Sequence, residues 1–136
     1  MGQQQLLLII LGVVVVGIAI AVGITMFADS AASSNRDAVV GDLQNLAARA
    51  QEFYRRPTSL GGGQFSFSLL TTSAISVLTN IPTNANGSYF IETGGTGTGT
   101  SSLVVIKGVG IELFNGSPVA AHDFVYPDRD SVVVIN

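Results

Sequence analysis

The sequence predicts an α+β fold in which one long N-terminal helix packs against a small antiparallel β-sheet. Three observations predict it. No charged side chain occurs from Met1 to Ala28, the apolar residues from Val39 to Phe53 recur at helical spacing, and short β-rich runs bounded by turn residues follow residue 87. With 136 residues, the chain has the size of one domain with one modest core.

The composition excludes several functional classes. Charged residues make up 11% and hydrophobic residues 47%, which is unlike a disordered chain. The net charge of −3 argues against a nucleic-acid partner. The chain has no Cys and a single His, so it has no disulfide, thiolate zinc site, cysteine nucleophile or multi-histidine metal site. The Gly- and Thr-rich run 93–102 lacks the Lys and helix start of a phosphate loop. We therefore expect neither catalysis nor a cofactor.

Residues 1–28 form the first expected segment, a helix that is apolar on all sides. The run Leu6–Phe27 is long enough to cross the roughly 30 Å of a bilayer core. A cleaved signal peptide is disfavoured because no basic residue precedes the run. A plain membrane anchor and a helix that packs among copies of itself remain open. Small residues spaced by four, Gly17 with Ala21 and Ala19 with Gly23, permit close helix approach.

Residues 29–57 form the second segment, an amphipathic continuation of the helix. Its apolar stripe predicts the core between helix and sheet: Val39, Leu43, Leu46, Ala50 and Phe53. The opposite face is expected to carry Arg36, Asp37, Asp42, Asn45, Arg49, Glu52 and Arg56. Pro57 ends the helix, which we predict from about Gln3 to Arg56. The polar segment 29–35 is compatible with a kink, a break or a continuous helix.

Residues 58–136 form the third segment, a small β-rich surface domain. The alternation in Gln64–Leu70 predicts a strand, and a short helix is compatible with Leu69–Leu78. Asn115-Gly116 predicts a hairpin turn, and the short connections favour an antiparallel meander. Five further runs are typical of strands: Ser88–Glu92, Leu103–Lys107, Gly110–Phe114, Val119–Val125 and Ser131–Ile135.

This organisation resembles the type IV pilin superfamily, which includes bacterial pilins, pseudopilins and archaeal pilins. Gly2 followed by Gln3 and the apolar run resembles the family's processing site, so that Gln3 would become the mature N-terminus. Bacterial pilins usually carry a glutamate at the fifth mature position, where this chain has Leu7, and archaeal pilins often lack it.

The resemblance implies a structural subunit that starts in the membrane and becomes a homopolymer, an extracellular filament on the cell surface. It implies a prepilin peptidase and a pilus assembly machinery as partners. The alternative is a minor pseudopilin or a single-span anchored protein with a small β ectodomain. The residues expected to pack in the filament core are Leu6, Leu7, Leu8, Ile9, Ile10, Gly12, Val16, Gly17, Ile20, Ala21, Gly23, Ile24 and Phe27.

The β-rich segment contains candidate glycosylation sites and a candidate calcium site. Asn86 and Asn115 match the N-glycosylation pattern. The hydroxyls of Thr96, Thr98 and Thr100 are candidates for O-glycosylation, and the plainer interpretation is a surface loop. The set Asp123, Asp128 and Asp130 is a weak calcium candidate, and a solvated turn is favoured over it. His122 is expected to point outward from a strand.

Overall fold

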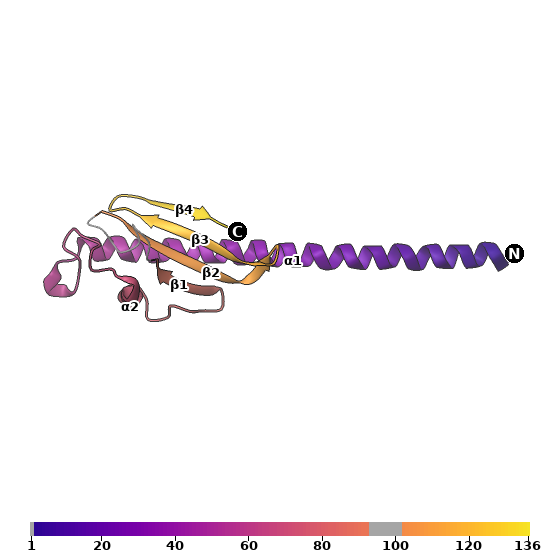
Figure 1. Ribbon diagram of the computed structural model, residues 1–136, viewed down its shortest axis with the longest axis horizontal. Coiled ribbons are helices and arrows are strands. Elements are labelled where there is room, and N and C mark those ends of the chain that lie inside the picture. Colours follow the sequence, from indigo (N-terminus) through magenta and orange to yellow (C-terminus); the bar gives the residue numbers. More distant parts are fainter. Residues whose placement is uncertain (1, 93–101) are drawn as a thin grey trace.

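The computed structural model describes residues 2–92 and 102–136, and it confirms the predicted α+β fold. One helix lies along a four-stranded antiparallel sheet, and its N-terminal half projects beyond that sheet (Figure 1). The elements are α1 Gly2–Arg55, η1 Thr58–Leu60, η2 Thr72–Ala74, α2 Ile75–Leu78, β1 Gly87–Ile91, β2 Val104–Phe114, β3 Ser117–Val125 and β4 Asp130–Val134.

Helix α1 is continuous through residues 29–35, which decides the point that the sequence left open. This stretch contains neither Gly nor Pro, and Ala32 and Asn35 are already buried against the sheet. Tertiary contacts therefore begin within the polar segment and hold it helical. At the standard rise, the 54 residues of α1 extend over about 80 Å.

The sheet has the strand order β1-β2-β3-β4, with every neighbouring pair antiparallel. The expected separation of Leu103–Lys107 from Gly110–Phe114 is wrong, because both runs belong to the single strand β2. The pairing with β3 shifts between Val109 and Leu113, so a bulge replaces the expected break. The hairpin turn is confirmed, with φ of 50° at Asn115 and 80° at Gly116.

The core lies between the apolar stripe of α1 and the inner face of the sheet. The five stripe residues of the sequence prediction are all buried there, together with residues from all the strands except the edge strand β4, such as Ile91, Ile106 and Ala121. Glycine lets α1 approach β2 closely. A Cβ at Gly108 would lie 2.8 Å from Cγ1 of Val39, and one at Gly110 would lie 2.1 Å from Oδ1 of Asn35.

The strand predicted over Gln64–Leu70 is wrong. This segment instead folds back on the end of α1, where the amides of Gly63 and Phe65 donate to the carbonyls of Phe53 and Tyr54 at 2.9 and 2.7 Å. These bonds satisfy carbonyl groups that the helix itself leaves free. The short helix compatible with 69–78 is reduced to η2 and the four residues of α2.

Candidate functional site: the projecting half of α1

The first half of α1 presents an apolar surface on all sides. Its large apolar side chains are between 51% and 81% exposed, from Val14 to Phe27. The best 18-residue window has a mean hydropathy of 3.2 with none of it buried, so α1 is long and apolar enough to cross a membrane. All thirteen residues expected to pack in a filament core lie on this half, and Gly2 and Gln3 are exposed in its first turn.

Three glycines of this half have no explanation within a single chain. A Cβ added at Gly12, Gly17 or Gly23 would meet nothing within 4 Å. Glycine in a helix interior costs about 0.5–1 kcal/mol relative to alanine. We call the folded part of the protein, which consists of α1 from Ala32 onward and the described residues that follow α1, the head. The three glycines do not contribute to the packing of the head, but they leave small surface patches where another helix can approach closely.

Helix α1 is joined to the rest of the head by a polar cluster around Asp42. Its Oδ2 accepts hydrogen bonds from the hydroxyl of Tyr89 at 2.6 Å and from Nδ2 of Asn84 and of Asn86, each at 2.9 Å. Burial by itself would raise the pKa of Asp42, but the three hydrogen bonds outweigh it and lower the pKa. Burial, and then the contact with Asp42, raises the pKa of Tyr89.

A second junction is made by Asn35, where α1 enters the head. Its Nδ2 donates to the carbonyl of Asn86 at 2.7 Å, and its Oδ1 accepts from the amide of Glu112 at 3.3 Å. The side chain is almost fully buried, so both bonds form away from water. Asn35 thus fixes α1 to the start of β1 and to the β2 bulge together.

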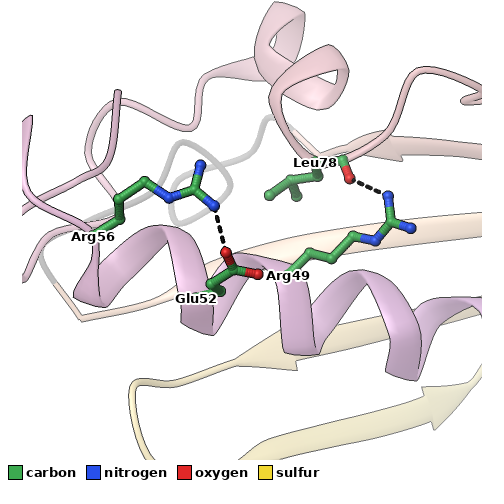
Figure 2. Close-up of polar contacts among 4 residues, drawn as sticks. All are labelled: Arg49, Glu52, Arg56 and Leu78. Carbon is green, nitrogen blue, oxygen red and sulfur yellow. Dashed lines mark hydrogen bonds and ion pairs between the residues drawn. The ribbon is translucent and has the colours of Figure 1, made fainter. Parts of the chain in front are cut away.

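The groove between α1 and α2 carries two arginines. Nη1 of Arg49 donates to the carbonyl of Leu78 at 2.9 Å, and Arg56 forms an ion pair with Glu52, four positions earlier on α1 (Figure 2). The cavity beside them measures about 230 Å³ and is also lined by Phe53. Because Glu52 already neutralises Arg56 and Arg49 is held by a carbonyl, this groove offers no free pair of cations to an anion.

The calcium candidates are not brought together. Asp123 is fully buried, with its neighbours Ala121 and Val125 on the inner face of β3, whereas Asp128 and Asp130 are exposed. Within residues 2–92 and 102–136, no group of three His, Asp or Glu side chains is placed to hold a metal ion. Burial, and then the charge of Asp130, raises the pKa of Asp123 to about 7. The nearby backbone amide of Ser131 lowers the pKa of Asp123 and so offsets part of this rise. In the described part of the chain, both carboxylate oxygens of Asp123 are buried without a hydrogen-bond partner.

His122 lies on the outer face of the sheet, as expected, and contacts Glu92. The atoms Nε2 of His122 and Oε2 of Glu92 are 3.2 Å apart, with Nζ of Lys107 at 3.8 Å from Oε1 of Glu92. Within the described part of the chain, Nε2 of His122 is buried and has no hydrogen-bond partner. This cluster is a cross-strand charge pairing on a half-buried surface, which typically adds a few tenths of a kcal/mol.

The two N-glycosylation candidates differ in their surroundings. Nδ2 of Asn86, the atom that would carry a glycan, donates to Asp42, and the carbonyl of Asn86 accepts from Asn35. Asn115 is exposed at the tip of the β2–β3 hairpin. The folded chain therefore leaves Asn115 accessible and engages Asn86. Thr96, Thr98 and Thr100 lie outside the described residues.

The sequence predicts Asp42 and Arg49 on the solvent face of the helix. This is wrong for Asp42, which is half-buried by the segment 84–89. Arg49 is exposed as predicted, and it also donates a hydrogen bond to the carbonyl of Leu78. One pattern in the sequence could have indicated these contacts. The polar residues Asn35, Asp42 and Arg49 recur at steps of seven along one flank of the apolar stripe.

Comparison of the chain with protein-family models, with curated proteins and with solved structures finds no match to any of them. The geometry of the chain itself therefore carries the functional argument.

Proposed function

We propose that this chain is the structural subunit of an extracellular filament of the type IV pilus kind, and that it polymerises through the projecting half of α1. One observation carries the proposal. A single continuous helix of 54 residues is half embedded in a folded head and half free, and the free half is apolar on every side. A surface of this kind must be covered by lipid or by other helices.

The proposal requires two stages, a precursor held in the membrane and a subunit assembled in the filament, and the size of the exposed apolar surface accounts for both. Burying one large apolar side chain contributes about 1.5–3 kcal/mol, and the projecting half carries fourteen of Leu, Ile or Val alone. The precursor covers these side chains with the bilayer, and the filament covers them with the same helices of other copies. The glycines at positions 12, 17 and 23 support the second stage, because an isolated anchor has no need of close helix contacts.

The remaining partners follow from the resemblance. A prepilin peptidase would cut after Gly2, which is exposed at the start of α1, and an assembly machinery would extract the subunit from the membrane. The sheet and its loops would form the coat of the filament. The role is structural and involves no chemistry, cofactor or nucleic acid.

The test is cryo-electron microscopy of material sheared from cells that express the full chain, with mass spectrometry of its N-terminus. We expect thin filaments whose central density fits residues 6–27 as helices, and a first residue at Gln3. If the sheared fraction lacks filaments and the protein stays in the membrane, the chain is instead a minor pseudopilin or an anchored ectodomain.

A further inference from the structure

The sequence contains the dipeptide Asn-Gly twice, and the fold places the two copies in different surroundings. Asn86-Gly87 lies at the start of β1. Asn115-Gly116 forms the turn between β2 and β3, at the end of the sheet where α1 leaves the head (Figure 1). Asparagine is one of the chemically labile residues, and it is most reactive before glycine, because no side chain shields the following backbone amide. The two copies therefore show how the fold controls this reactivity.

The reaction joins the asparagine side chain to the backbone amide of the next residue. The glycine nitrogen forms a bond to Cγ of the asparagine and loses its proton to solvent, while Nδ2 leaves as ammonia. The resulting cyclic imide takes up one water molecule, which opens the ring at one of its two carbonyls. Opening at the side-chain carbonyl gives aspartate. Opening at the main-chain carbonyl gives isoaspartate, whose main chain runs through Cβ and Cγ. The amide must be free, and the backbone must be able to turn.

Both reacting groups are engaged at Asn86-Gly87. Nδ2 of Asn86 donates to Oδ2 of Asp42 at 2.9 Å, and the amide of Gly87 donates to Oδ1 of Asn84 at 3.1 Å. Gly87 is buried in β1 opposite Gly110, where an added Cβ would lie 2.2 Å from a carbonyl oxygen of β2. The backbone cannot turn there unless the strand pairing is lost. The fold therefore protects this copy of the dipeptide.

Neither reacting group is engaged at Asn115-Gly116. Both residues are exposed, and within the described part of the chain neither the Asn115 side chain nor the Gly116 amide makes a hydrogen bond. A Cβ added at Gly116 would meet nothing within 4 Å, so solvent reaches the turn. Only two residue pairs, the last being Phe114 with Ser117, lie between the turn and the bulge of β2. The turn can therefore open locally while the rest of the sheet stays paired.

We propose that Asn115 is a site of spontaneous deamidation, which converts it to isoaspartate and aspartate in the folded chain, and that Asn86 is spared. Water is the only co-reactant, and ammonia is the only product released. The inference concerns the head alone, so it does not depend on assembly of the chain into a filament. It assigns a chemical change to the β2–β3 turn, in addition to the structural role proposed for the chain.

The turn is also connected to the segment that follows β4. Nδ2 of Asn136 donates to the carbonyls of Phe114, Ser117 and Pro118 at 3.2, 3.1 and 3.3 Å. Isoaspartate adds a carbon atom to the main chain of a two-residue turn that is closed by φ angles of 50° and 80°. The three carbonyls then cannot all keep their positions, so isoaspartate formation should release Asn136 from the hairpin.

Mass spectrometry tests the proposal, because trypsin separates the two sites. Cleavage after Lys107 and Arg129 gives peptide 108–129, in which Asn115 carries the only side-chain amide. The full chain is made in a host without N-glycosylation and is kept folded in detergent micelles at pH 8 and 37 °C. Peptide 108–129 should then change over time into two acidic isomers. Asn86, in the preceding peptide, should react at least several-fold more slowly. In urea, where the head is unfolded, both sites should react at similar rates.

Asn115→Gly is the matched control, because a Gly-Gly turn keeps the hairpin and has no amide to lose. After the same incubation, hydrogen exchange at residues 130–136 should be several-fold faster in the natural chain and unchanged in Asn115→Gly. Unchanged exchange in converted natural chain would refute the release of Asn136.

Two results would overturn the deamidation itself. One is a folded chain in which Asn115 keeps its amide while the urea sample converts. The other is equal conversion of Asn86 and Asn115 in the folded chain. Because the subunits are measured in micelles, neither result bears on the proposed filament, which the sheared material tests separately.

Discussion

The hydroxyl of Tyr89 donates a hydrogen bond of 2.6 Å to the carboxylate of Asp42, which joins β1 to α1 across 47 positions of the sequence. Asn84 and Asn86 donate to the same oxygen, so one carboxylate holds the segment 84–89 against the helix. The head thus depends on a polar junction as well as on its apolar core.

Removal of the Tyr89 hydroxyl should destabilise the head. We expect Tyr89→Phe to lower the free energy of unfolding by about 1–2 kcal/mol, since the bond is made to a charged group in a half-buried place. Urea unfolding of the full chain in detergent micelles, followed by near-ultraviolet circular dichroism, measures it. Tyr54→Phe is the matched control, because the Tyr54 hydroxyl makes no hydrogen bond in the described part of the chain. Equal losses in both variants would contradict the role given to Asp42.

The same junction should weaken in acid. The pKa of Asp42 is lowered in the folded chain, so its contribution to stability is present above the ordinary value of 3.8 and is lost as the pH falls through the folded pKa. The difference between the natural chain and Tyr89→Phe should therefore shrink below pH 3.8. A difference that stays constant down to pH 2 would show that the bond does not depend on the carboxylate charge.

Asp123 should give the opposite dependence in a separate range of pH. Its folded pKa is raised to about 7 from 3.8, so the folded chain binds more protons than the unfolded chain between these values. The contribution of Asp123 to stability is then fully present below pH 3.8 and falls by about 1.4 kcal/mol per unit as the pH rises toward 7.

Asp123→Asn should flatten this slope and make the head more stable than the natural chain at pH 8. Unfolding in urea at intervals from pH 4 to pH 8 measures both effects. Asp128→Asn serves as the control, because Asp128 is exposed on the neighbouring turn. Parallel curves for the natural chain and Asp123→Asn would mean that Asp123 is charged in the folded head.

Two glycine substitutions should change stability in opposite directions. Gly110→Ala would place its Cβ 2.1 Å from Oδ1 of Asn35, so α1 or β2 must shift and we expect a loss of about 1–3 kcal/mol. Gly41→Ala meets nothing within 4 Å inside α1 and should add about 0.5–1 kcal/mol. Unfolding midpoints of the two variants check this, and a neutral Gly110→Ala would refute the close approach at Asn35.

Bulk at Gly17 should abolish filaments without affecting the head. A Cβ added at Gly17 meets nothing within 4 Å in the single chain, so we expect any effect on assembly to arise between chains. We expect Gly17→Leu to leave the free energy of unfolding unchanged and to remove filaments from the sheared fraction. Ile18→Leu, which keeps the volume, is the control. Normal filaments from Gly17→Leu would argue for a lone anchor.

The sequence by itself determined the long helix, its division into an apolar and an amphipathic half, the buried stripe from Val39 to Phe53 and the antiparallel sheet. These features follow from periodicity and from turn residues such as Asn115, which act over a few positions of the chain. The tertiary structure decided the rest. It merged two runs into β2, turned Gln64–Leu70 into a cap on α1, buried Asp123 and engaged Asp42. Each of these depends on which distant groups come into contact and on which backbone groups they satisfy, and local sequence does not encode that.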